Sequence, residues 1–255
     1  MDKIIIKKIN EEISLTLSVE DFKKYFSLKQ ERTASSPSGR HMGHYKVIIE
    51  CICRENFLLP DLILAIAQTS LATASPLARW HHASQVMLEK GKGSFVENLR
   101  IIQLCEADLN FVLHKIWGHG LTRHALSHNA LDKAQFALPG QTCNNAVLNK
   151  VLFLDLSRQL FSPGILVDYD ASAAFDWVLA NLSMVTCQRV GLPRIAGYFM
   201  TYLLKHMTFH LITGFGKSAK CYTTTVDEVT GQGVLQGSSS AAPLYIFNSD
   251  IPTNI

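Results

Sequence analysis

The chain has 255 residues, of which 47% are hydrophobic and 18% charged, so it can bury enough apolar surface to offset its ordering entropy, and disorder throughout is excluded. Lys and Arg number 24 against 21 Asp and Glu, giving a formal net charge of +3. This charge permits nucleic-acid binding without indicating it, because dedicated binders are usually far more basic. No apolar run approaches the ~18 residues of a membrane span, and the first eight residues hold too short an apolar stretch for a signal peptide. We therefore expect an intracellular protein without a membrane partner, cytoplasmic or nuclear.

The six cysteines show no CxxC pair and no repeated spacing. In a chain of this size without a secretion signal, this pattern indicates buried free thiols rather than a disulfide framework or a zinc site. They are Cys51, Cys53, Cys105, Cys143, Cys187 and Cys221.

The first half of the sequence predicts helices around two strands. Ser18, followed three residues later by Asp21, is close to a capping box and predicts a short helix through Phe26. The polar segment 29–41 predicts an exposed loop. Further on, we expect strands at 83–89 and 99–104, a long helix at 106–127 interrupted at Gly118 and Gly120, and a helix with one apolar face at 143–160.

The second half combines short strands with helices. Residues 164–167 form an apolar run that predicts a buried strand ending in Asp168-Tyr169-Asp170. A helix is expected from about Ser172 to Val190, another over 194–207, and two β-rich stretches, 207–213 and 221–229, joined by a hairpin. A helix-like stretch follows Ser238. The fold class indicated is α+β.

Asp168 and Asp170 lie two residues apart, so in a strand their carboxylates share a face. Burying carboxylates is costly without a compensating cation, and Mg²⁺ prefers carboxylate and carbonyl oxygens. The sequence is therefore compatible with a magnesium site here. A solvated strand end with a helix N-cap is the alternative.

Three further segments have candidate chemistry. Small residues after Asp170 allow a tight turn that places Phe175 and Asp176 on the first helical turn, although the chemistry of Phe175 alone favours a core position. The glycine- and serine-rich segment 233–240 permits close backbone approach to a ligand, or is an ordinary loop. Lys90, Lys92 and Arg100 surround a flexible turn that suits a triphosphate or nucleic-acid backbone, or is simply solvated.

Two other patterns are set aside. Gly216-Lys217-Ser218 ends like a P-loop, but Leu211 stands where GxxxxGK[ST] needs glycine, so a hairpin tip is expected. Four histidines between His114 and His128 share one helical region, but no glutamate of an HExxH motif accompanies them.

The order of these segments is more informative than any one of them. Asp170, Phe175 and Asp176 fit a D-x-x-x-x-F-D block. The segment 233–238 fits a block of glycine, apolar residue, variable residue and Gln-Gly-Ser. Residues 99–104, followed by 106–110, look like a variant of an R-P-I-x-L block. From about residue 30 to its end, the chain resembles the reverse transcriptase domain of retrotransposons.

This resemblance implies a right-hand polymerase: an N-terminal helical extension over 1–28, fingers over 29–163 and a partial palm over 164–255. The palm would hold an antiparallel sheet packed on helices, with no thumb. An RNA template, a DNA primer and deoxynucleoside triphosphates would be its partners. The implied roles are Mg²⁺ binding by Asp170 and the Ala171 carbonyl, triphosphate contact by Lys90 and Arg100, sugar contact by Phe175, contact with the nucleotide and template base by Gln236 and Gly237, and template contact by Gln135 and Phe136.

The chain departs from the family pattern in several places. The third catalytic block needs an Asp-Asp pair, and the sequence contains none; Asp250 is single. Ile101 stands where the finger block has proline, and Ser240-Ala241-Ala242-Pro243 replaces the usual Ser-Pro. One carboxylate cannot hold two Mg²⁺ ions, so we expect no polymerase activity from this chain alone. Mg²⁺-dependent primer extension on an RNA template would contradict that expectation.

Three alternatives remain at this point. The chain could be a non-catalytic nucleic-acid-binding remnant of a retroelement, which binds an RNA–DNA hybrid in a salt-dependent way without extending it. It could be a helical metal-binding protein that uses the histidine run. It could also be an RNA-dependent RNA polymerase, although the bulky Phe175 favours deoxynucleotides.

Overall fold

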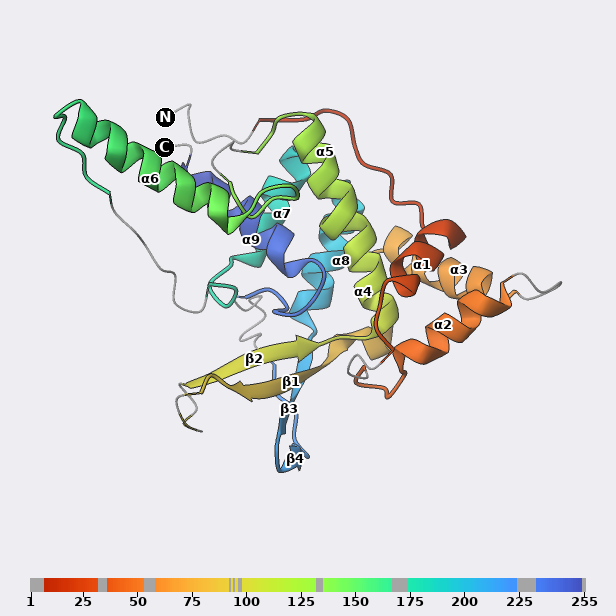
Figure 1. The fold of residues 1–255 in the computed structure, drawn as a ribbon. Helices are drawn as coiled ribbons and strands as arrows, with labels where there is room; N and C mark the ends of the chain where they lie inside the picture. Colours follow the sequence, from red (N-terminus) through yellow and green to blue (C-terminus); the bar gives the residue numbers. More distant parts are fainter. Residues whose placement is uncertain are drawn as a thin grey trace.

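The computed structural model describes residues 7–31, 36–52, 58–91, 93, 95, 98–131, 135–166, 174–223 and 233–253. It confirms the α+β class, with a small sheet on one side of a group of helices (Figure 1). The strands are β1 His82–Glu89, β2 Leu99–Leu104, β3 Thr208–Thr213 and β4 Gly216–Lys217. The helices are α1 Val19–Ser27, α2 Met42–Cys51, α3 Leu59–Ala72, η1 Ala78–His81, α4 Ala107–Leu113, η3 His114–Leu121, α5 Thr122–Ser127, α6 Cys143–Gln159, α7 Ala180–Arg189, α8 Arg194–Lys205 and α9 Ala241–Thr253.

The sheet has the strand order β2-β1-β3-β4, and it is mixed. β1 and β2 form the antiparallel pair expected from their sequence, with Glu89 opposite Leu99. β3 and β4 form a hairpin that turns at Gly214 as expected, but its second strand is Gly216–Lys217 rather than the expected stretch 221–229. In the described part of that stretch, Tyr222 forms a single bridge with Phe209 of β3. β1 and β3, however, are parallel, with Ser84 opposite His210, so the prediction of an antiparallel sheet is wrong for this pair. Helices α4 to α8 lie between these two strands in the chain and supply the long crossover that a parallel pair needs.

A continuous helical column, α4-η3-α5, covers the segment for which a long interrupted helix was expected. The interruption is a change of helix type: η3 is a π-helix that contains both Gly118 and Gly120. A Cβ at Gly118 would lie 2.8 Å from the Ser239 carbonyl oxygen, so glycine allows the segment before α9 to approach the column. Trp117 and Leu121 of this column are completely buried.

The helix α1 belongs to the core. Ser18 Oγ accepts a hydrogen bond from the Asp21 N–H at 3.1 Å, which confirms the expected cap. Phe22 and Phe26 are fully buried, and Phe26 stacks on Tyr45 of α2 with ring centroids 4.5 Å apart. The segment 1–28, predicted as an extension, therefore contributes its described helix to the same aromatic cluster as α2 and α4.

Ionisation of Tyr25 in this cluster is expected to lower the stability of the fold at alkaline pH. Burial raises the pKa of Tyr25 from 10.0 to about 12, against a smaller lowering by a hydrogen bond with Ser239. The folded pKa is above the unfolded one, so this stabilisation is complete below pH 10 and is lost as the pH rises to 12, by about 3 kcal/mol. We expect Tyr25→Phe to reduce the fall of unfolding free energy in that window, measured by urea denaturation. An unchanged pH slope would contradict this.

Residues 164–166 differ from expectation. They form no strand, and Ile165 is 87% exposed, so the buried strand predicted for 164–167 is wrong for the part that the structure describes. A Cβ at Gly164 would lie 3.0 Å from Phe153 Cζ and from Ser157 Oγ. The segment therefore folds back on α6 instead of joining the sheet.

The helix α6 forms where it was expected, but its apolar face is not covered. None of its residues is buried, and Figure 1 shows it extending away from the other helices. Among the helices of the described ranges, none is long and apolar enough to cross a membrane.

The five described cysteines are free thiols, as expected. The prediction that they are buried holds for Cys105 and Cys187 but is wrong for Cys143 and Cys221, which are exposed. Cys143 is the first residue of the exposed α6, and Cys221 lies in the segment after β4, so neither has core packing around it.

Candidate functional site

Two turns that are far apart in the sequence lie together in the fold. Residues 174–177 form turns, and α7 begins only at Ala180, later than the helix start expected near Ser172. The reason is that two backbone carbonyls here accept hydrogen bonds from another segment instead of from their own helix. Phe175 O accepts from Val234 N at 3.0 Å, and Val178 O accepts from Gly233 N at 2.9 Å. The described residues that follow Asp170 are thus hydrogen-bonded to the glutamine-glycine segment.

The turn over residues 233–238, here called the Gln-Gly turn, is fixed to β2. Gln103 N donates to Gln236 O at 2.7 Å. Gly237 has φ +109°, and a Cβ there would lie 2.8 Å from Gln103 O. Only glycine satisfies both this left-handed backbone and this close approach. β2 is the first strand in the order, so the turn occupies its open edge.

Core packing and serine contacts hold the Gln-Gly turn in place. Val234 and Leu235 are buried, and Ser238 N donates to Leu235 O at 2.8 Å. Ser239 N donates to Asn110 Oδ1 of α4 at 3.2 Å. The half-buried Gln236 and the exposed Gly237 therefore stand on a rigid base immediately before α9.

The basic hairpin carries its cations along the same strand edge. Arg100 is opposite Leu88, and Lys90 N donates to Asn98 O at 3.1 Å. Strand alternation places Lys90, Arg100 and Ile102 on one face, and Ile102 Cγ2 lies 3.1 Å from the position of a Cβ at Gly237. Arg100 is about 10 Å of strand from Gln103, where the Gln-Gly turn is bonded. Both cations are exposed; Lys92 lies outside the described residues.

A cavity of about 250 Å³ opens beneath the two turns. Gln85 and Gln103, opposite each other on β1 and β2, line it together with Asp176 and Tyr222. The Tyr222 hydroxyl donates to Gln85 Oε1, whereas Gln103 Oε1 is buried and has no hydrogen-bond partner within the described part of the chain. Burial raises the pKa of the Asp176 carboxyl. The lining of the cavity therefore includes an unpaired acceptor, Gln103 Oε1, and a carboxyl with a raised pKa, Asp176.

Phe175 lies at the junction between this site and the core. Its ring is half-buried and packs against Tyr245 of α9, with centroids 5.5 Å apart. Its carbonyl holds the Gln-Gly turn. The residue thus makes the core contact that its chemistry favoured and borders the segment with which the resemblance associates it.

Other residues named from the sequence are not brought to this site. Gln135 and Phe136 are half-buried in a turn, where Gln135 Oε1 accepts from Ala137 N at 3.2 Å. The contacts of the described residues connect neither of them to the two turns. Asp170 and Ala171, the implied metal ligands, lie outside the residues that the structure describes.

The part of the chain that the structure describes contains no group of three or more His, Cys, Asp or Glu arranged to hold a metal ion. His124 and His128 have ring centroids 4.3 Å apart. His124 Nε2 is 3.0 Å from the Glu11 carbonyl oxygen, and His128 Nε2 is 3.6 Å from Glu11 Oε2. These rings have neighbouring groups of the protein itself as partners.

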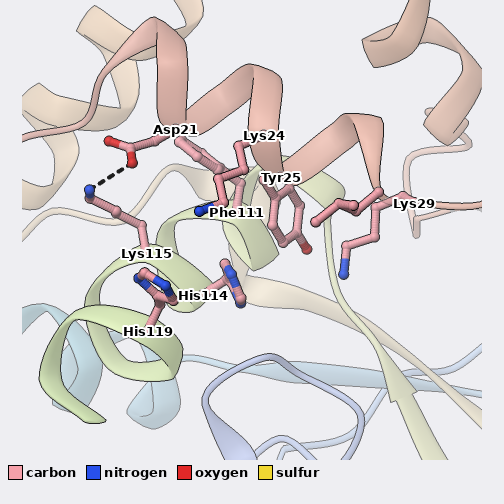
Figure 2. A pocket seen from close by; sticks show the side chains of 9 residues that line it. Asp21, Lys24, Tyr25, Lys29, Phe111, His114, Lys115 and His119 are labelled. Carbon is pink, nitrogen blue, oxygen red and sulfur yellow. Dashed lines mark ion pairs between the residues drawn. The ribbon is translucent and has the colours of Figure 1, made fainter. Parts of the chain in front are cut away.

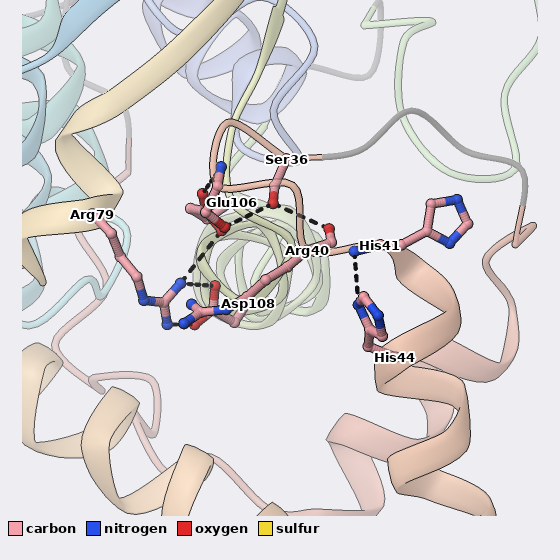
Figure 3. Close-up of polar contacts among 8 residues, drawn as sticks. Ser36, Arg40, His41, His44, Arg79, Glu106 and Asp108 are labelled. Atoms are coloured by element: carbon pink, nitrogen blue, oxygen red, sulfur yellow. Dashed lines mark hydrogen bonds and ion pairs between the residues drawn. The ribbon is translucent and has the colours of Figure 1, made fainter.

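Sequence reasoning missed a buried ionic cluster at the corner between β2 and α4 (Figure 3). Arg79 forms a two-pronged ion pair with Asp108, and its Nη1 lies 3.5 Å from Glu106 Oε2. Ser38 donates to both Glu106 oxygens, from N at 2.8 Å and from Oγ at 2.9 Å. The signal was present as two acids directly after an apolar strand, the pattern that suggested a cation at Asp168 and Asp170.

Arg79 is the cation that this cluster needs. Partial burial lowers its pKa, but the hydrogen bonds and charge of Asp108 outweigh burial, so the net pKa is raised. The cluster joins the loop at Ser38, the helix η1 and the start of α4. It therefore fixes the end of the strand that supports the Gln-Gly turn.

Comparison of the chain with protein-family models and with curated proteins found no match. Its interpretation rests on its own geometry: an α+β fold in which a glycine-rich turn and the turn after Asp170 meet, and the glycine-rich turn lies on the open edge of β2, the strand that carries Arg100.

Proposed function

We propose that this chain is a reverse transcriptase domain fragment of a retroelement, with fingers and a partial palm. The chemistry would be template-directed transfer of deoxynucleotides to a primer 3′-hydroxyl. The observation that carries the proposal is the joining of residues 174–178 to the Gln-Gly turn on the β2 edge that carries Arg100. Two sequence blocks, each weak alone, are thus neighbours in space, and one of them lies on the strand that carries Arg100.

Each part of this edge has a role in the proposal. Lys90 and Arg100 contact the triphosphate of the incoming nucleotide, and guanidinium is well suited to phosphate oxygens. Gln236 and Gly237 lie beside the nucleotide and template base, and Phe175 borders the sugar. Gln135 and Phe136 approach the template strand. Positioning and charge neutralisation, rather than a nucleophilic side chain, carry such a reaction.

Mg²⁺ is the cofactor in this proposal, held by Asp170 and the Ala171 carbonyl. The ion, when bound, supplies neutralisation of phosphate charge. Because the sequence has no Asp-Asp pair, a second metal has no carboxylate ligands of that kind. We therefore expect nucleotide binding without primer extension.

The test is deoxynucleotide binding by an Arg100 variant. We expect Arg100→Met to weaken binding of dTTP roughly tenfold, because it removes one charge-assisted contact to phosphate. Titration calorimetry on the full chain in the presence of Mg²⁺ measures this. Arg194→Met is the matched control, since it removes the same charge from an exposed position at the start of α8. Equal losses in the two variants, or no binding by the unaltered chain, would overturn the proposal.

A non-catalytic nucleic-acid-binding remnant is the second candidate, favoured by the exposure of Lys90 and Arg100 on a hairpin. In that case an RNA–DNA hybrid binds with an affinity that falls with salt, and dTTP does not compete for the site. Competition by dTTP, lost in Arg100→Met, favours the polymerase fragment.

A further inference from the structure

A second cavity, of about 300 Å³, lies between α1 and the α4-η3 column (Figure 2). Tyr25, Leu28 and Phe111 give it an apolar floor, and the ring of Tyr25 packs against that of His114, with centroids 5.1 Å apart. Its volume is at the lower end of the range for small-molecule sites. The cavity thus has room for a nucleotide-sized group rather than for a bare ion alone.

Positive groups dominate the walls of this cavity. Lys24, Lys29 and Lys115 line it with two histidines, and Asp21 is the one acid among the described lining residues. That acid is already paired, because Asp21 Oδ1 lies 2.8 Å from Lys115 Nζ. Lys24 and Lys29 therefore leave an excess of positive charge at the mouth. Lys29 Nζ lies 4.4 Å above the Tyr25 ring, which keeps the charge at the apolar floor.

The π-helix brings both imidazoles to the same cavity. His114 and His119 are five residues apart, and their ring centroids are 5.9 Å apart. In an α-helix, residues at this spacing point about 140° apart, whereas the i→i+5 hydrogen bonds of a π-helix stack them on one side. The unusual helix therefore turns two hydrogen-bonding rings toward Lys24 of α1 and Lys29, which follows that helix.

Burial lowers the pKa values of three groups at this cavity, and neighbouring positive charge lowers those of the two histidines further. Burial lowers the pKa of His114, and Lys29, His119 and Lys24 lower it further. Burial also lowers the pKa of His119, as do Arg123, Lys24 and Lys115, with only Asp21 acting in the opposite direction. Burial lowers the pKa of Lys29. An anion in the cavity would act on these pKa values in the opposite direction.

We propose that this cavity binds the phosphate group of a nucleotide, either a free mononucleotide or one unit of a nucleic-acid strand. The phosphate monoester of a free nucleotide carries close to two negative charges at neutral pH and offers three acceptor oxygens, and the phosphodiester of a strand carries one negative charge and two such oxygens. These match the ammonium groups of Lys24 and Lys29 and the imidazoles of His114 and His119. The sugar and base lie on the apolar floor formed by Leu28 and Phe111. This site is separate from the strand edge proposed for nucleotide transfer, so either proposal can fail without the other.

The test follows imidazole nitrogen signals of the full chain by NMR during titration with three probes: inorganic phosphate, AMP and a short oligo(dT) strand. We expect the signals of His114 and His119 to shift saturably and their pKa values to rise. Lys24→Met and Lys29→Met each weaken binding roughly tenfold, since each removes one charged contact. Lys24 is exposed, so its replacement leaves the core of α1 intact.

Lys23→Met is the matched control, because Lys23 is on the same helix but pairs with Glu20 at 3.4 Å, away from the cavity lining. It should leave the affinity unchanged. Tighter binding of AMP identifies the free nucleotide as the source of the phosphate, and tighter binding of the strand identifies nucleic acid; both support the site. Absence of histidine shifts with all three probes, or an equal loss in Lys23→Met, overturns it.

Discussion

Replacing Arg79 by methionine is expected to destabilise the fold by about 3–5 kcal/mol, because the change leaves two buried carboxylates without their cation. The side chains of Glu106 and Asp108 are only 1% and 3% exposed, so water cannot replace the guanidinium. Methionine keeps much of the length of the side chain, which separates loss of charge from loss of packing. Urea denaturation followed by circular dichroism measures the free energy of unfolding.

Two further variants test whether the loss of stability comes from the uncompensated carboxylates. Arg79→Lys keeps the charge but loses the two-pronged contact with Asp108, so an intermediate loss is expected. Arg79→Met combined with Glu106→Gln and Asp108→Asn removes the uncompensated charges and should recover part of the stability. A loss below about 1 kcal/mol for Arg79→Met would show that the cluster behaves like an exposed ion pair.

Replacing Gly237 by alanine is expected to cost about 2–3 kcal/mol and to detach the Gln-Gly turn from β2. The left-handed backbone contributes about 1–2 kcal/mol, and the 2.8 Å approach of a Cβ to Gln103 O adds the weakening of the Gln103 N–Gln236 O bond. Faster amide hydrogen exchange at Gln103, together with urea denaturation, measures the two parts of the effect.

The chain offers a matched control for backbone strain. Gly91 also has a positive φ, +75°, but nothing lies within 4 Å of a Cβ built there. Gly91→Ala should therefore cost about 1 kcal/mol and leave the exchange of the Gln103 amide unchanged. If both alanine variants lower the free energy of unfolding equally, the close approach at Gly237 makes no measurable contribution to it.

Local signals in the sequence predicted most of the secondary structure. The cap at Ser18, the alternation in β1 and β2 and the glycines of the β4 hairpin all depend on near neighbours, and the structure forms each element there. The burial expected for apolar segments agreed less well with the structure. Residues 164–166 and α6 have apolar side chains without the core position that those side chains suggested, because apolar content does not specify which surface a segment packs against.

The candidate site shows the same division. The structure joins the turn that contains Phe175 to the Gln-Gly turn by hydrogen bonds, a proximity that the order of the sequence blocks alone does not establish. The metal-binding role of Asp170 stays a prediction, because that residue lies outside the described part. The buried cluster around Arg79 joins three segments that are distant in the sequence. One sequence alone does not indicate which arginine forms an ion pair with which acid.

The contact of Ser239 with two helices has a consequence for motion. Its carbonyl oxygen lies so close to Gly118 that no larger residue fits there, and its side chain hydrogen-bonds Tyr25. Ser239 consequently links α1 and the π-helix η3 to the end of the Gln-Gly turn. A displacement of α1 large enough to break the contact between Tyr25 and Ser239 would therefore also disturb the base on which Gln236 stands.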